Sequence, residues 1–314
     1  MSFRLRFRRS DRRSQREPEP SELKQIERYH LITEIGRGSV GTVYAAHDPG
    51  LDRQIALKLV PREELPGPSD SGARRRRERG AETRAGAAEL DARLVHEARV
   101  MARLSHPNIV PIYDVGTTDD VVYIAMELID GRTLADWLEQ TPRSWREVLG
   151  VYLQAGRGLA AAHAAGIIHR DFKPQNVLIG RDHRVRVLDF GLSRVAERPA
   201  GESAGDTVSG TPRYMAPEQL KGEPCDARAD QFSYCVALYE ALYRQRPFTG
   251  TTLFAIADQV LDGKLRPPPT DTRVPRWLFE HIRRGLSVEP DDRHPNLRSL
   301  LASIVFTTRV MYSY

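Results

Sequence analysis

Residues 169–176 read His169-Arg170-Asp171-Phe172-Lys173-Pro174-Gln175-Asn176, and Asp189-Phe190-Gly191 begins thirteen residues after Asn176. Two short β-like runs, 177–179 and 185–188, lie between these motifs. An aspartate that follows His-Arg is weak evidence when it is taken alone. The complete run of eight residues, followed at this distance by 189–191, is highly specific.

A glycine-rich segment stands near the start of the chain and reads Ile35-Gly36-Arg37-Gly38-Ser39-Val40-Gly41-Thr42-Val43. Glycines let a backbone approach phosphates closely and present N–H donors to them. The same spacing occurs in dinucleotide-binding loops, which need a helix directly after the loop. Residues 42–46 read instead as a strand. On this motif alone, a hairpin turn with incidental glycines remains an alternative.

A lysine on a predicted strand follows, in Ala56-Leu57-Lys58, seventeen residues after Gly41. A lysine on the buried side of a strand needs an anionic partner. A nucleotide phosphate would serve, and so would Glu97 on the next predicted helix. Taken alone, Lys58 reads as an edge-strand lysine and Glu97 as a solvated helix carboxylate.

The periodicity divides the chain into a strand-rich part and a helical part. Five strand-like runs and one helix, which Pro107 closes, lie before residue 127. Such an order indicates a small sheet-rich lobe, a larger helical lobe and a cleft between them. The predicted strands are 30–33, 43–46, 54–60, 110–113 and 121–126, and the predicted later helices are 133–139, 146–165, 227–243, 251–261, 275–286 and 296–305.

Together these motifs resemble the protein kinase family, and most of all the bacterial eukaryotic-like serine/threonine kinases. The resemblance runs from about Tyr29 to about Ser303. It implies a bilobal α+β fold, with a five-stranded antiparallel N-lobe that carries one main helix and a mostly helical C-lobe. The expected parts are a basic disordered tail (1–28), a kinase domain (29–303) with an N-lobe (29–126), a flexible insertion (62–93) and a C-lobe (130–303), and a C-terminal tail (304–314).

The resemblance also implies a reaction, the transfer of the γ-phosphoryl group of ATP to Ser or Thr hydroxyls of proteins. Asp171, Lys173 and Asn176 are the expected catalytic residues, with Asp171 as the base and Lys173 neutralising charge on the transferred group. Asn176 and Asp189 are expected to hold Mg²⁺.

The remaining expected contacts concern the nucleotide. Residues 35–43 would cover the phosphates of ATP, and Lys58 would bind the α- and β-phosphates while it pairs with Glu97. Backbone groups of Glu127 and Ile129 would contact adenine. Met126 would stand beside them as the gatekeeper.

Other residues are expected to support or regulate the site. Glu218 would pair with Arg293, and Asp230 would anchor the catalytic loop from a buried helix. Arg170 would bind a phosphate on the activation segment. We therefore expect autophosphorylation at Thr207 or Ser209, for which a transient homodimer is allowed, whereas Thr211 would help to select a Ser/Thr substrate.

Charge and cysteine content limit the partners. The net charge of +5 comes from 1–28 and 62–93 rather than from a folded surface, and the tail has few aromatic residues. We therefore expect no nucleic-acid partner. No apolar run reaches the length of about 18 residues that a membrane span needs. With only Cys225 and Cys235 and no Cys-x-x-Cys pair, we expect reduced thiols and a cytoplasmic location.

Two rival functions have different sequence requirements. A pseudokinase scaffold would lack at least one of Lys58, Asp171 and Asp189, and all three are present. A small-molecule kinase of related fold would lack Ala216-Pro217-Glu218 and Thr211, which are also present. Both rivals are therefore disfavoured.

Overall fold

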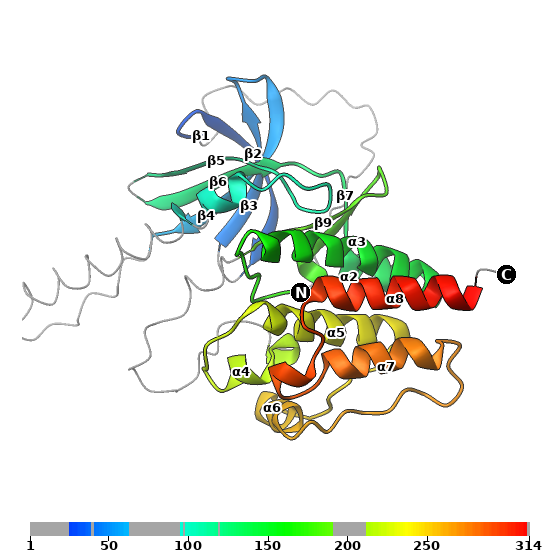
Figure 1. Ribbon diagram of the computed structural model, residues 1–314. Coiled ribbons are helices and arrows are strands. Elements are labelled where there is room, and N and C mark those ends of the chain that lie inside the picture. Colours follow the sequence, from blue (N-terminus) through cyan, green and yellow to red (C-terminus); the bar gives the residue numbers. More distant parts are fainter. Residues whose placement is uncertain are drawn as a thin grey trace, which may run out of the picture.

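The computed structural model describes residues 25–38, 41–62, 95–96, 98–118, 120–190 and 212–312. Within these residues a β-rich lobe lies against a mostly helical lobe, which confirms the α+β bilobal prediction (Figure 1). The predicted insertion lies outside the described residues except for Arg62, whose N–H donates to Asp120 O at 2.9 Å.

The N-lobe sheet has six antiparallel strands among the described residues, one more than the sequence predicts. The additional strand pairs Gln25 with His30, so the sheet includes two residues that precede the predicted start of the kinase domain at Tyr29. In sheet order the strands are β1 (Gln25–Ile26), β2 (Tyr29–Gly38), β3 (Gly41–Asp48), β4 (Arg53–Pro61), β6 (Val121–Glu127) and β5 (Ile112–Thr117).

Strand β5 begins two residues later than predicted because the preceding residues pair with the other lobe. Val110 N donates to Val187 O at 3.1 Å, and Val187 N donates to Asn108 O at 3.0 Å. The apolar run that reads as one strand is therefore divided between the two lobes.

Residues 98–102, which precede this run, are helical, and Ala98 and Met101 are buried.

A three-stranded sheet lies at the junction of the lobes, in the order β7 (Gly131–Thr133), β8 (Val177–Gly180), β9 (Val185–Val187). The sequence predicts β8 and β9 but not β7, whose three residues are too few for a recognisable alternation. Gly131 pairs with Gly180, and a Cβ on Gly131 would lie 2.3 Å from Ile179 O. Only glycine allows this close approach.

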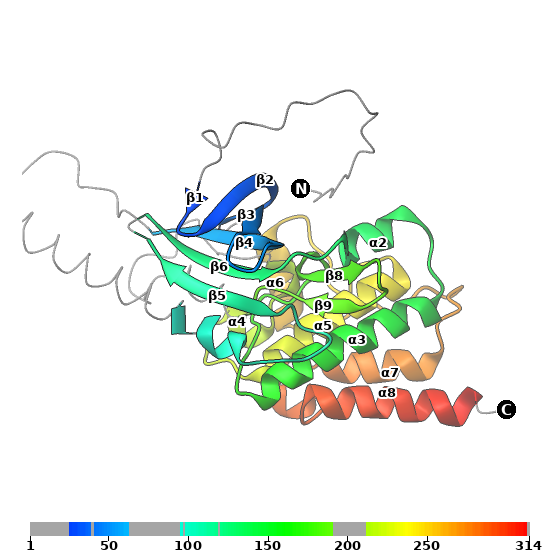
Figure 2. The same cartoon turned by 90° about the horizontal axis from the view of Figure 1, so that it is seen from above.

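The C-lobe is built around two long helices. α5 (Ala227–Tyr243) is buried on nearly every side, and α3 (Trp145–Ala164) begins at a capping box formed by Ser144 and Glu147. Figure 2 shows α3 running beside β9, with α7 and α8 side by side. The other α-helices are α2 (Leu134–Gln140), α4 (Pro217–Leu220), α6 (Leu253–Leu261), α7 (Arg276–Gly285) and α8 (Leu297–Tyr312).

Helix α8 extends beyond its predicted end at residue 305 and occupies most of the predicted C-terminal tail at 304–314. Ile304 is fully buried, and Thr308 Oγ1 donates to its carbonyl at 2.8 Å. No glycine or proline interrupts residues 297–312, so the sequence contains no stop signal there. Helix α8 therefore continues without a break from the predicted kinase domain into residues 304–312.

Candidate active site

The catalytic loop brings the three predicted catalytic residues together. Lys173 Nζ lies 2.6 Å from Asp171 Oδ2, and Asn176 Nδ2 donates to Asp171 O at 2.8 Å. The same amide nitrogen lies 3.3 Å from Asp171 Oδ2. One carboxylate thus has a cation and an amide donor beside it, and these two contacts fix its direction.

Asp230, on the buried helix α5, holds this loop in place. Its carboxylate accepts hydrogen bonds from His169 N, Arg170 N and His163 Nε2, each at 2.7 Å. Burial alone would raise the pKa of Asp230, but the hydrogen bond and charge of His163 and the donors of His169 lower it below the ordinary value. The predicted anchor is therefore present, and it has a histidine partner that the sequence did not single out.

His169 joins the catalytic loop to the segment that carries Asp189. Its Nε2 lies 2.7 Å from Leu188 O, and its ring centroid lies 4.7 Å from that of Phe190. Leu188 N in turn donates to Asn176 O at 2.9 Å. Asn176 and Asp189, the two predicted metal ligands, are thereby placed on neighbouring, hydrogen-bonded segments.

Lys58 contacts the second predicted metal ligand directly. Lys58 Nζ lies 2.8 Å from Asp189 Oδ1, and the lysine is 5% exposed. Burial opposes ionisation of Asp189, but the charge and hydrogen bond of Lys58 lower its pKa below the ordinary value. Glu97, the predicted partner of Lys58, lies outside the described residues. The buried lysine thus has the anionic partner that its burial requires, supplied here by the other lobe.

Two residues of the site have left-handed backbone conformations. Arg170 has φ of 65° and Asp189 has φ of 58°, and each conformation costs about 1–3 kcal/mol in a residue other than glycine. Asp230 accepts a hydrogen bond from the N–H of Arg170, and Gln219 Nε2 donates to the carbonyl of Arg170 at 2.9 Å. Tertiary contacts on both sides of the peptide therefore maintain the strained conformation.

The glycine-rich segment forms the β2–β3 hairpin, as predicted. Gly36 pairs with Val43 and Gly38 with Gly41, whereas Ser39 and Val40 lie outside the described residues. Gly41 has φ of 145°, and a Cβ there would lie 2.2 Å from Leu59 O, so glycine is required. Ile35 and Val43 pack against the core cluster that contains Ala56 and Met126. Thr42 precedes Val43 in β3. Arg37 binds Glu34 on the exposed surface.

Residues 127–129, which connect the predicted N-lobe to the predicted C-lobe and are called the hinge, follow the buried Met126. Ile129 is also buried, and Glu127 N donates to Pro111 O at 3.0 Å. The N–H of Glu127 is thus already used within the protein. A cavity of about 30 Å³ lies behind Met126 and is lined by Met101, Ile112 and Phe190 among others.

The model of the protein kinase domain matches residues 29–303. The chain belongs to the protein kinase family. This chain is 33% identical over 286 residues to serine/threonine-protein kinase PknE of Mycobacterium bovis, a match that covers 91% of this chain and 47% of PknE. The prediction of a bacterial eukaryotic-like serine/threonine kinase is thereby confirmed.

Two further relatives are similar to this chain. It is 35% identical over 279 residues to serine/threonine-protein kinase PknL of Mycobacterium tuberculosis, covering 88% of this chain and 65% of PknL. It is 33% identical over 277 residues to a serine/threonine-protein kinase of Myxococcus xanthus, covering 86% of this chain and 36% of the relative. The chain therefore spans 36–65% of the length of these three proteins.

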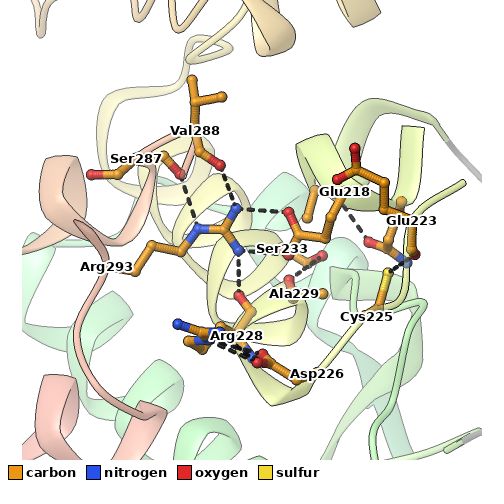
Figure 3. Close-up of polar contacts among 12 residues, drawn as sticks. Glu218, Glu223, Cys225, Asp226, Arg228, Ala229, Ser233, Ser287, Val288 and Arg293 are labelled. Carbon is orange, nitrogen blue, oxygen red and sulfur yellow. Dashed lines mark hydrogen bonds and ion pairs between the residues drawn. The ribbon is translucent and has the colours of Figure 1, made fainter. Parts of the chain in front are cut away.

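The kinase domain also contains the predicted pair at the end of the activation segment. Both terminal nitrogens of Arg293 lie 2.8 Å from carboxylate oxygens of Glu218, and both residues are buried (Figure 3). The activation-segment residues Ser193, Ser203, Thr207, Ser209 and Thr211 lie outside the described residues. No helix within the described residues is long and apolar enough to cross a membrane.

Sequence reasoning missed several residues that the structure places around the site. His163 and Gln219 support the catalytic loop, and Arg186 lies beside Glu127. His163 is one of several polar residues in a long amphipathic helix, so nothing in its local pattern distinguishes it. Arg186 interrupts the apolar run 185–188, and an arginine between buried valines was a usable signal.

Proposed function

We propose that this chain transfers the γ-phosphoryl group of ATP to Ser and Thr hydroxyls of proteins, with Asp171 as the catalytic base. The observation that carries the proposal is the position of Asp171 between Lys173 and Asn176. Phosphoryl transfer needs little covalent help, and this cluster supplies a base, a cation and oriented dipoles.

Asp171 accepts the proton of the substrate hydroxyl and orients its oxygen toward the transferred group. Lys173 lies close enough to Asp171 to contact both this carboxylate and a phosphoryl oxygen next to it, so it neutralises charge that develops during transfer. Because the amide nitrogen of Asn176 binds Asp171, the side-chain oxygen of Asn176 is turned away and is free to bind a cation.

Asn176 and Asp189 would hold Mg²⁺, which would neutralise negative charge on the phosphates when it is bound. The donor set fits a hard cation, because an amide oxygen and a carboxylate with only Oδ1 engaged by Lys58 offer oxygen ligands. Lys58 would contact the α- and β-phosphates beneath the glycine-rich hairpin. The carbonyl of Glu127 and the backbone of Ile129 would bind adenine.

We further propose that autophosphorylation within the activation segment, at Thr207 or Ser209, switches the enzyme on. Among the residues that the structure describes, no carboxylate lies within ion-pair distance of the Arg170 guanidinium, which supports a role as a phosphate ligand. The reaction would take place in trans within a transient homodimer. We place it in the cytoplasm, where ATP is available and where a chain with two cysteines and no Cys-x-x-Cys pair would stay reduced.

A transfer assay with γ-labelled ATP, Mg²⁺ and casein as acceptor tests the function. Wild type should label casein, whereas Asp171→Asn and Lys58→Met should each lose at least about a hundredfold in rate. Asp262→Asn is the matched control, because Asp262 only pairs with Lys264 on the surface. A folded wild type that is as inert as Asp171→Asn would establish the scaffold function instead.

Peptide mapping after incubation with Mg-ATP tests the switch. Phosphate should appear at 207 or 209, and Arg170→Met should reduce the activity of the phosphorylated form to that of the unphosphorylated form. No phosphate anywhere in 193–209 would refute autophosphorylation of this segment, while casein labelling would still decide the catalytic proposal.

A further inference from the structure

The hairpin formed by β8 and β9 contacts both ends of the predicted hinge. At the C-terminal end, Gly131 pairs with Gly180 and Arg181 N donates to Asp130 O at 2.9 Å. At the N-terminal end, Arg186 Nε lies 3.6 Å from Glu127 Oε2. A single hairpin of the C-lobe thus borders the whole segment that joins the two lobes.

Arg186 is the buried centre of this arrangement. Its side chain is 9% exposed, and Asp182 binds it through both carboxylate oxygens, with Nη1–Oδ1 at 3.2 Å and Nη2–Oδ2 at 2.8 Å. The two terminal nitrogens are therefore committed to Asp182, while Nε faces Glu127. An arginine can do this because its planar guanidinium presents donors in several fixed directions, whereas a lysine presents one point charge.

The backbone of the turn leaves room for this ion pair. A Cβ on Gly180 would lie 2.4 Å from Asp182 Oδ1 and 3.1 Å from Arg186 Nη1. Any side chain at 180 would therefore displace the two charged groups. Val185 and Val187, on either side of Arg186, are fully buried in the C-lobe core. The backbone that carries the Arg186 side chain is therefore held in place.

Glu127 is attached to the N-lobe on its other side. Its Cα partner in β4 is Ile55, and its N–H donates to Pro111 O. Arg53, two residues before Ile55, lies with its guanidinium 3.6 Å from the centroid of the Tyr113 ring. The pKa of Tyr113 is raised above its ordinary value, mainly by burial and then by the negative charge of Glu127. The Glu127 carboxylate thus lies between a cation of the C-lobe and charged and aromatic groups of the N-lobe.

We propose that Arg186, fixed by Asp182, is a positioning residue that holds Glu127 and thereby the hinge backbone that binds the nucleotide base. The identity of the ligand rests on the proposed function, but the contact itself does not. Arg186 touches neither phosphate nor the acceptor hydroxyl in this scheme. Its effect should therefore fall on nucleotide affinity and base selectivity rather than on the transfer step.

Two variants remove the contact from either side without changing side-chain size much. Arg186→Met and Glu127→Gln should each weaken binding of Mg-ADP by about five- to tenfold in calorimetry, and the double variant should bind no more weakly than either single one. The control is Arg181→Ala, which removes an exposed ion pair with Asp130 from the same turn and should change binding less than about twofold.

Base selectivity separates positioning from a loss of stability. Arg186→Met should reduce the preference for Mg-ADP over Mg-GDP, and Arg186→Lys should recover only part of it. A variant that merely destabilises the fold would lower the melting temperature and leave this ratio unchanged. That result, or strictly multiplicative effects in the double variant, would refute the proposal.

Amide hydrogen exchange tests the contact without any nucleotide. Residues 127–131 should exchange faster in Arg186→Met than in wild type, and at the wild-type rate in Arg181→Ala. Unchanged exchange in Arg186→Met would refute the positioning role. Failure of wild type to bind Mg-ADP would contradict the proposed function instead, and the exchange result would still decide whether Arg186 fixes the hinge.

Discussion

Arg293 binds both carboxylate oxygens of Glu218 at 2.8 Å, and the guanidinium is enclosed by three backbone carbonyls (Figure 3). These carbonyls belong to Arg228, Ser287 and Val288. The pair therefore joins the end of the activation segment at α4 to the segment before α8. Arg293 is only 1% exposed, and each nitrogen of its buried guanidinium donates to an acceptor of the protein.

Glu218→Gln should destabilise the kinase domain by about 3–5 kcal/mol, because it leaves a buried guanidinium without a counter-charge. The free energy of unfolding in urea measures this loss. Asp291→Asn removes one of the two acidic partners of Arg228 on the surface, where Asp291 is 93% exposed, and should cost less than about 1 kcal/mol. Equal losses in the two variants would contradict the structural role assigned to Glu218.

Asp230→Asn should reduce the turnover number more than it raises KM for ATP. The side-chain amide has one acceptor oxygen for three donors, and its NH₂ group would face the N–H of His169 or Arg170. The loop that carries Asp171 would then lose its orientation, while the glycine-rich hairpin is unaffected. Steady-state kinetics checks the split, and a change in KM alone would show that Asp230 does not position the loop.

Two glycines of α3 should respond to alanine with opposite sign. Gly150→Ala should stabilise the domain by up to about 1 kcal/mol, because a Cβ there meets nothing within 4 Å and alanine favours helix. Gly158→Ala should destabilise it, because the Cβ would lie 2.3 Å from Asn108 O. Thermal unfolding distinguishes the two, and stabilisation by Gly158→Ala would mean that α3 can move away from residue 108.

The Asp182–Arg186 pair should contribute to stability in a way that depends on pH. The hydrogen bonds from Arg186 lower the pKa of Asp182 from 3.8 to about 2. A depressed pKa stabilises the fold above the unfolded value of 3.8, and this contribution is lost as the pH falls through the folded value of about 2. The stability difference between wild type and Asp182→Asn should therefore be constant above about pH 5 and shrink between about pH 4 and about pH 2. A difference that does not vary with pH would contradict the pairing.

Much of the site could be predicted because its residues lie in short motifs. Asp171, Lys173 and Asn176 are close in sequence, so local chain geometry alone brings them near one another. The anchor at Asp230 and the pair formed by Glu218 and Arg293 came from the resemblance rather than from spacing. The structure places both as expected.

The contacts that escaped prediction depend on how separate segments pack. The partner of Lys58 is Asp189, from the other lobe, and local pattern gives no means of choosing among several carboxylates. The start of β5 depends on pairing of residue 110 with β9, which no periodicity reports. The contact of Arg186 with Glu127 likewise requires the β8–β9 turn to dock against the hinge.

Arg170 and Asp189 keep left-handed backbones on either side of the catalytic centre, although glycine would relieve the strain at both positions. Laboratory evolution for heat resistance alone should therefore enrich Arg170→Gly. It should also enrich Asp189→Gly once the buried Lys58 has been replaced by an uncharged residue, because no buried lysine then needs the Asp189 carboxylate as its counter-charge. The sequence of this domain that is most stable to heat and the sequence that is most active are consequently different. Evolutionary retention of these two side chains would then record selection on catalysis rather than on folding.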